Sequence, residues 1–261
     1  MIYKTDYHIH TTFSDGKAAP EEYIPAARNA GLREMGFSEH LYLSRPEPDW
    51  NIDLLKINDY FRIIDGLAAE NKDILIRKSL EIDYIPGREN ETEIFLSGIN
   101  LDYRIGSVHN IGEKPFDTGP DFFAEKDIDL LFENYFELIN MAAGSGLFDI
   151  IGHCDYIRIY GNKPSKDPEP WYRRLARTMK SCDVAFELNT NGRNRPLADF
   201  YPDRNFLHIF REENIPVCVN SDAHIPSRVG QYFDEAYQLL KAAGYREMAT
   251  FEGRKRKMVP F

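Results

Sequence analysis

The first residues with side chains suited to chemistry are His8, His10 and Asp15, near the start of a 261-residue chain. In an extended strand, residues two apart point to the same side, so both imidazoles can face one point. Asp15 follows in a polar turn that can fold back toward them. Two imidazoles and a carboxylate this close are typical of a metal site, although a single pair of strand histidines is structural about as often.

The same pattern recurs along the chain. Six of the seven histidines stand at the end of an apolar segment, and Glu81 and Asp222 occupy similar places; the six are His8, His10, His40, His109, His153 and His224. The seventh, His208, falls inside a predicted helix, where we expect a structural role. A shared structural role would not concentrate histidines in this way, so the pattern predicts metal binding.

Strand-like and helix-like segments alternate about seven times. We predict strands at 6–10, 33–38, 74–80, 102–108, 148–152, 184–188 and 216–220, and helices at 20–30, 51–70, 127–143, 171–181, 203–213 and 232–243. This alternation indicates a parallel sheet with helical crossovers. An open sheet would spread the strand-end residues along an edge, whereas a closed barrel gathers them at one mouth. We therefore predict a single domain, residues 1–261: an α/β fold of the (β/α)7 barrel type, TIM-like, with its metal site at the C-terminal mouth of the strands.

The composition limits the partners. A net charge of −10 opposes a nucleic-acid partner, because phosphate backbones attract basic surfaces; it suits a small substrate. Three cysteines without a Cys-x-x-Cys pair, Cys154, Cys182 and Cys218, indicate reduced thiols and a cytoplasmic protein. The first strand starts so close to Met1 that we expect no signal peptide, and no apolar run approaches the roughly 18 residues of a membrane span. The sequence gives no oligomeric state.

An ordered set of motifs runs through most of the chain. It consists of Tyr7-His8-Ile9-His10-Thr11 with Ser14-Asp15-Gly16, Gly36-Phe37-Ser38-Glu39-His40, Glu81-Ile82-Asp83-Tyr84, Gly106-Ser107-Val108-His109, Ile151-Gly152-His153 and Asn220-Ser221-Asp222-Ala223-His224. This set resembles the polymerase-and-histidinol-phosphatase (PHP) superfamily. Segments 106–111, 115–117 and 187–190 are similar to its branch of stand-alone histidinol-phosphatases.

The resemblance implies a distorted (β/α)7 barrel with three divalent metal ions, either zinc, iron or manganese. Carried over by position, the ligands of the first ion would be His8, His10, Glu81 and Asp222. Glu81 would bridge to a second ion held with His109 and His153, and Asp15, His40 and His224 would hold the third. The implied activity is hydrolysis of a small phosphorylated substrate, most closely L-histidinol phosphate, to L-histidinol and phosphate in histidine biosynthesis.

Phosphomonoester hydrolysis needs acceleration of up to ~10²¹-fold, whereas a positioned acid or base contributes only about 10²–10⁴-fold. Metal ions supply the difference by lowering the pKa of bound water toward about 7 and neutralising phosphoryl charge. Our hypothesis is in-line attack by a metal-bridging hydroxide without a covalent intermediate. The residues we expect to carry it are Glu81, Asp15, His40, Asp222 and His224.

A phosphate group also calls for arginine, whose planar fork matches its oxygens. Arg158 resembles an arginine of the family. The family usually has Gly-(apolar)-Arg after its Asn-Thr element, but here Asn194 takes the arginine position, so Arg193 or Arg195 is the second candidate.

Weaker signals lie outside these motifs. Tyr42, Glu113 and Tyr156 are loop residues that could contact an amine or imidazole of the substrate. Residues 254–257, Arg-Lys-Arg-Lys, are expected to form a solvated tail.

Three alternatives stay open at this point. A PHP phosphoesterase for another small phosphorylated metabolite is favoured by the altered arginines. An exonuclease or polymerase accessory module predicts a basic groove or an attached polymerase domain, and neither is visible. A metal-binding scaffold without activity would be expected to have lost ligands, and none of the nine is missing.

Overall fold

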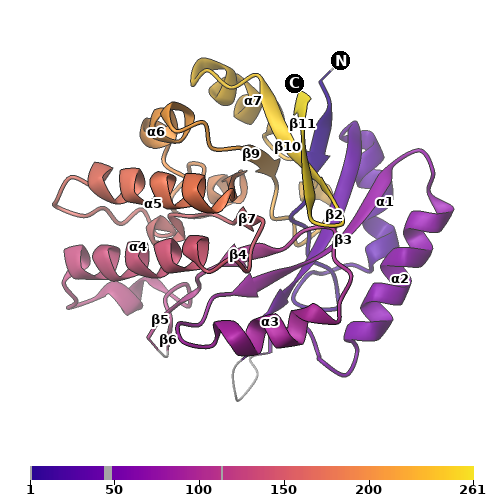
Figure 1. Ribbon diagram of the computed structural model, residues 1–261, viewed down its shortest axis with the longest axis horizontal. Coiled ribbons are helices and arrows are strands. Elements are labelled where there is room, and N and C mark those ends of the chain that lie inside the picture. The colour runs from indigo at the N-terminus through magenta and orange to yellow at the C-terminus, as the bar shows by residue number, and fades with distance from the viewer. Residues whose placement is uncertain (1, 44–48, 113) are drawn as a thin grey trace.

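The computed structural model describes residues 2–43, 49–112 and 114–261, so Glu113 lies outside the described residues. Seven parallel strands form a nearly closed barrel with helices between them, in the order β1-β2-β3-β4-β7-β8-β9 (Figure 1). Beyond the ends of β1 and β9, Ile9 and Ala223 pair in parallel and bring the two edges together. The Ala223 N–H donates to the His8 carbonyl at 3.1 Å, and the His10 N–H donates to the Ala223 carbonyl at 3.0 Å. The predicted distorted (β/α)7 barrel is confirmed.

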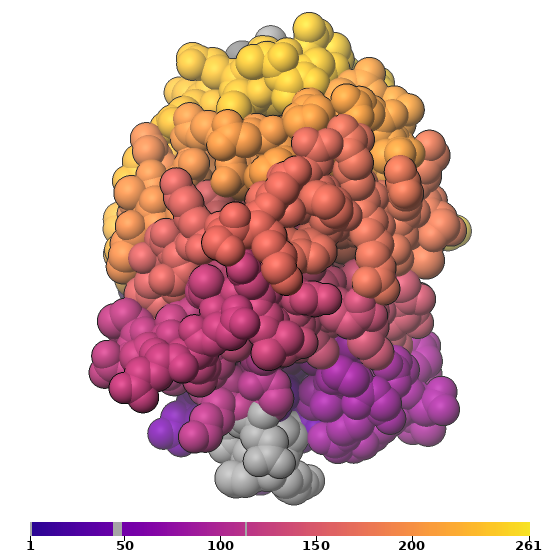
Figure 2. All heavy atoms as spheres, turned by 90° about the vertical axis from the view of Figure 1, so that its left-hand side faces the viewer, coloured from indigo at the N-terminus to yellow at the C-terminus, as the bar shows by residue number. Residues whose placement is uncertain are grey.

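The barrel strands are β1 (Lys4–Asp6), β2 (Leu32–Leu41), β3 (Leu75–Asp83), β4 (Ile105–Ser107), β7 (Ile150–Ile151), β8 (Ala185–Asn189) and β9 (Val217–Asn220). The helices are α1 (Pro20–Asn29), α2 (Ile57–Glu70), α3 (Glu89–Ser97), α4 (Ile128–Gly144), α5 (Glu169–Cys182), α6 (Leu207–Glu212) and α7 (Phe233–Ala242). Figure 2 shows one side of the molecule, where chain colours run from purple at the bottom to yellow at the top. Consecutive βα units thus lie side by side, as in a barrel.

Most predicted elements are present, with different ends. The predicted helix 51–70 begins only at Ile57, and the predicted strands 102–108 and 148–152 shorten to β4 and β7. At their C-terminal ends, both strands stop just before a histidine whose N–H donates to a buried carboxylate instead of to a neighbouring strand. The His109 N–H donates to Asp83 at 3.0 Å, and the His153 N–H donates to Glu187 at 2.8 Å.

Besides the short 3-10 helices and a small hairpin of β5 (Asn110–Ile111) and β6 (Lys114–Pro115), two larger features were not predicted. Helix α3 carries few buried apolar residues, so its sequence shows little helical periodicity. The second feature is an antiparallel hairpin of β10 (Glu247–Glu252) and β11 (Lys255–Pro260) at the end of the chain. In Figure 1 it lies beside the N-terminus.

Residues 254–257 are mostly exposed, as predicted, but the prediction that they form a tail was wrong, because they belong to the hairpin. Ala249 and Phe251 of β10 pack inside the barrel in a cluster that includes Tyr7 and Tyr103. Arg254 fixes the turn of the hairpin: its Nε lies 2.9 Å from an Asp149 carboxylate oxygen. The hairpin therefore fills one end of the barrel, and Arg254 and Arg256 attach it to Asp149 and Asp183. No helix in the described part of the chain is long and apolar enough to cross a membrane.

Candidate metal centre

The C-terminal ends of the strands meet around one cavity of about 210 Å³. Six of the nine predicted metal ligands line it: Asp15, His40, His109, His153, Asp222 and His224. The other three, His8, His10 and Glu81, are buried behind them with at most 1% of their surface exposed. The structure thus brings together, around one cavity, residues from strand ends spread over more than 200 positions.

Glu81 lies at the centre of the group. Strands β2 and β3 pair in a register that sets His40 directly opposite Glu81. Both carboxylate oxygens face imidazole nitrogens; the nitrogen–oxygen distances are 2.7 Å to His40, 2.9 Å to His153, 3.2 Å to His8, 3.6 Å to His10 and 3.8 Å to His109. One carboxylate that faces five imidazoles on two sides has the geometry of a bridging ligand.

The first predicted ligand set is compact. Asp222 Oδ1 lies 3.4 Å from His10 Nε2 and 3.8 Å from His8 Nε2, and His8 Nε2 lies 3.2 Å from Glu81 Oε2. A tetrahedral ion with bonds of about 2.1 Å holds its ligand atoms about 3.4 Å apart. These separations are therefore those that a divalent ion requires.

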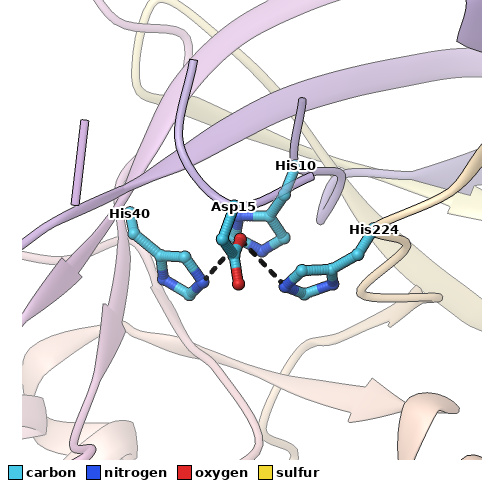
Figure 3. A group of neighbouring side chains, drawn as sticks. All are labelled: His10, Asp15, His40 and His224. Carbon is cyan, nitrogen blue, oxygen red and sulfur yellow. Dashed lines mark ion pairs between the residues drawn. The ribbon is translucent and has the colours of Figure 1, made fainter. Parts of the chain in front are cut away.

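A second compact group contains Asp15, whose turn folds back to the strand ends. A Cβ on Gly16 would lie 2.3 Å from the His10 carbonyl oxygen, so only glycine allows this return. Asp15 Oδ1 lies 3.2 Å from His224 Nε2 and 3.6 Å from His40 Nε2. Figure 3 shows these side chains and His10 pointing toward one another. His10 is thus near this group as well as the first one.

Buried polar atoms without a hydrogen-bond partner gather at this place. They include His8 Nε2, His10 Nε2, Asp15 Oδ1 and Glu81 Oε2. Such atoms are costly to bury unless something satisfies them. Imidazole nitrogens and carboxylate oxygens are ligands of zinc and related ions, so the donor set fits a cluster of divalent cations.

The carboxylates and imidazoles control each other's protonation. Burial opposes ionisation of Glu81, but the imidazoles of His8 and His40 hold the pKa of this carboxyl well below its usual value. Burial likewise opposes the charged form of His40, yet Glu81 raises its pKa to about 9. Burial and the neighbouring imidazoles of His40 and His224 lower the pKa of His10 to about 3. Protons here balance carboxylate charge, and binding of cations would displace them.

The three predicted phosphate-binding arginines have different positions, and of these only Arg195 lines the cavity. Arg158 is buried, with Nη1 2.7 Å from Asp155 and Nη2 3.2 Å from Asp203. Arg193 lies outside the cavity, and its Nη2 is 2.9 Å from Glu235. Arg193 and Arg195 differ in their backbone: Arg193 belongs to a 3-10 helix (Asn191–Asn194), whereas Arg195 follows it in an extended conformation.

Several cavity residues were missed by the sequence reasoning. The cavity is also lined by Trp50, Pro115, Asp117 and Thr118. Of the three residues predicted to contact an amine or imidazole of the substrate, Tyr156 lines it as well. Tyr42 is not among the lining residues; its ring stacks on Trp50 with centroids 5.8 Å apart. Asp117 belongs to segment 115–117, which is similar to the histidinol-phosphatase branch of the family. No local sequence pattern, however, distinguishes Asp117 from an aspartate on the protein surface.

Comparisons with known proteins give a consistent result. The PHP domain family model matches residues 6–191. The chain is 36% identical to the probable histidinol-phosphatase of Deinococcus radiodurans, with 98% of each chain covered. It is 30% identical to the histidinol-phosphatase of Lactococcus lactis subsp. lactis, over 97% of this chain and 96% of the relative. The structure of histidinol phosphate phosphatase from that bacterium, complexed with zinc, L-histidinol and phosphate, matches with a TM-score of 0.87 and 28% identity, over 98% of this chain and 100% of the other.

Proposed function

The chain belongs to the PHP domain family, and from this premise we propose that it is a metal-dependent histidinol-phosphatase. Its reaction is the hydrolysis of L-histidinol phosphate to L-histidinol and phosphate, a step of histidine biosynthesis in the cytoplasm. The observation that carries the proposal is the cavity itself, where imidazoles and carboxylates from all parts of the chain converge. Similarity over the full length to named histidinol-phosphatases supports the substrate. We treat residues 1–261 as one functional domain.

We assign three divalent cations to the centre. The first would be held by His8, His10, Glu81 and Asp222, the second by Glu81, His109 and His153, and the third by Asp15, His40 and His224. Zinc, iron and manganese all accept such ligands, and the similar Lactococcus enzyme is complexed with zinc. When bound, the cations lower the pKa of water and neutralise charge on phosphoryl oxygens.

Two charged residues outside the proposed ligand set, Arg195 and Asp117, line the cavity next to Tyr156. Arg195 supplies the guanidinium that would hold the phosphate. Asp117 is the one carboxylate among the described cavity-lining residues that belongs to no metal-ligand group. Tyr156 OH donates to Asp117 Oδ2 at 3.4 Å, and the charge of Arg195 also acts on Tyr156. A substrate that carries both a phosphate and an ammonium group would find a partner for each charge in this cavity.

Another part of the cavity wall is apolar. The ring of Trp50 stands edge-on to His40, with centroids 5.3 Å apart, and Pro115 continues the apolar surface. An imidazole ring of the substrate would pack on this surface.

The test is phosphate release from a panel of small phosphomonoesters, with metal analysis of the same sample. We expect kcat/KM for L-histidinol phosphate to exceed that for every other substrate by at least about tenfold, the equivalent of about 1.4 kcal/mol. Equal rates across the panel would remove the substrate assignment. A fully active sample without bound metal would remove the mechanism.

A second candidate is a phosphoesterase for a different small phosphomonoester. It is favoured by Asn194, which stands where the family usually has arginine and whose Nδ2 donates to Gln231 at 2.9 Å. The same panel decides between the two substrates. Nucleic acid is not proposed as a partner, because the net charge is −10.

A further inference from the structure

A second layer of buried carboxylates supports the proposed metal ligands from behind. Asp83 accepts from the His109 ring at 3.0 Å, and Glu39 accepts from the Thr11 backbone, at the turn that carries Asp15. Glu187 differs from these two because it contacts ligand residues from two separate strands. None of the three belongs to a group that could hold a metal ion.

Glu187 is completely buried, and both its oxygens are fully used. Oε1 accepts from His8 Nδ1 at 2.6 Å and from Asn220 Nδ2 at 2.8 Å. Oε2 accepts from the His153 N–H at 2.8 Å and from Asn189 Nδ2 at 2.8 Å. A carboxylate has about four lone-pair sites. Glu187 therefore has none left for a metal ion, although it is part of the same buried cluster.

These contacts fix ligand geometry at two places. Because a carboxylate only accepts, His8 donates from Nδ1 to Glu187, which leaves Nε2, 3.2 Å from a Glu81 oxygen, as the ring atom that can hold a cation. On the other side, the bond to the His153 backbone sets the position from which that imidazole reaches Glu81. A Cβ on Gly152 would lie 2.8 Å from Ser107 Oγ, so glycine lets this segment sit close to its neighbours.

We propose that Glu187 is a positioning residue that holds His8 and His153 for two different cations at once. This inference rests on the proposed assignment of the three cations. It has a specific consequence. Loss of Glu187 weakens the first and second cation sites together and leaves the third site, formed by Asp15, His40 and His224, unchanged.

The experiment compares Glu187→Gln with Glu34→Gln. Glu34 is a matched control because it is also a buried glutamate, 4% exposed. Its two carboxylate oxygens accept hydrogen bonds from Tyr3, Tyr7 and Arg77, and it contacts no proposed ligand side chain. Zinc per chain is measured by mass spectrometry, and zinc affinity is measured by competition with a chelator. We expect Glu187→Gln to keep one zinc of normal affinity and to bind the others about 10–100-fold more weakly, as found for residues that orient ligands. Glu34→Gln should keep the wild-type number and affinities even if it melts at a lower temperature.

Unchanged zinc number and affinity in Glu187→Gln overturns the proposal, as does equal weakening of all sites or the same loss in Glu34→Gln. If Glu187→Gln does not fold, Glu187→Asp takes its place. Aspartate keeps the charge but is one methylene shorter and cannot reach both His8 and His153, so the same selective loss is expected, and wild-type zinc binding refutes it. A wild-type protein that binds zinc but does not hydrolyse L-histidinol phosphate refutes the proposed function, while the zinc comparison still decides the role of Glu187.

Discussion

Replacing Arg195 with methionine tests how the substrate phosphate is held. Methionine has a similar length and lacks the charge and the forked donors. Arg195 lines the cavity, and its Nε has no hydrogen-bond partner among the described residues. Its loss should therefore leave the fold nearly unchanged and affect the substrate directly.

The expected size of the effect follows from the contacts that are lost. A hydrogen bond to a charged group contributes about 1.5–3 kcal/mol, and an arginine can make two of them to one phosphate. At about 1.4 kcal/mol for each factor of ten, kcat/KM for L-histidinol phosphate should fall by roughly 10²–10⁴-fold. Arg195→Lys should recover only part of this loss, because a point charge does not replace the fork.

Arg193→Met is the matched control. Arg193 is two residues away, but its side chain is 33% exposed and pairs with Glu235 outside the cavity. An ion pair of this kind contributes about 0–1 kcal/mol, and we expect kcat/KM to stay within about threefold of wild type. Phosphate release at varied substrate concentration, with the inhibition constant of inorganic phosphate, separates binding from catalysis. The reasoning is refuted if Arg195→Met stays within threefold of wild type or if Arg193→Met loses as much activity.

Other expected outcomes concern different parts of the molecule. Asp117→Asn should raise KM about tenfold or more for L-histidinol phosphate, since it removes a charged partner of the ammonium group, but should leave KM for an aryl phosphate that carries no ammonium group unchanged. Equal effects on both substrates would contradict this role. Arg158→Met should lower the free energy of unfolding by about 3–5 kcal/mol, because it leaves the buried carboxylate of Asp155 and the partly buried one of Asp203 without their guanidinium partner. Urea titration measures this change, and wild-type stability would show that the pairing is unimportant. Prolonged treatment with a chelator should abolish phosphatase activity, and added zinc, iron or manganese should restore it; activity that survives complete metal removal would exclude the proposed centre. In the native protein a thiol reagent should label the exposed Cys182 quickly and Cys154 and Cys218 slowly. The last two are buried, and burial raises the pKa of both thiols. Rapid labelling of all three would contradict the packing of the barrel.

The sequence was sufficient for the barrel and for the set of candidate ligands. Both depend on local regularities: strands alternate with helices, and polar residues follow each apolar strand. Since parallel strands in a barrel direct their C-terminal ends to one mouth, His8 and His224 could be placed together without knowledge of any contact. Their role as metal ligands remains a proposal, but the structure does bring these residues together.

The tertiary structure decided which polar residues face the cavity and which support it. Arg193 and Arg195 are equivalent as sequence, but only Arg195, just past the short helix that contains Arg193, lines the cavity. Glu187 contacts His8 across 179 positions of the chain, a separation that no periodic pattern encodes. The basic sequence around Arg254 resembles that of a solvated tail, but in the structure Phe251, three residues earlier, is packed inside the barrel. The local sequence pattern determines whether a segment forms a helix or a strand and which polar residue follows it. The partner of a buried charge depends instead on packing between distant segments, which is present only in the folded chain.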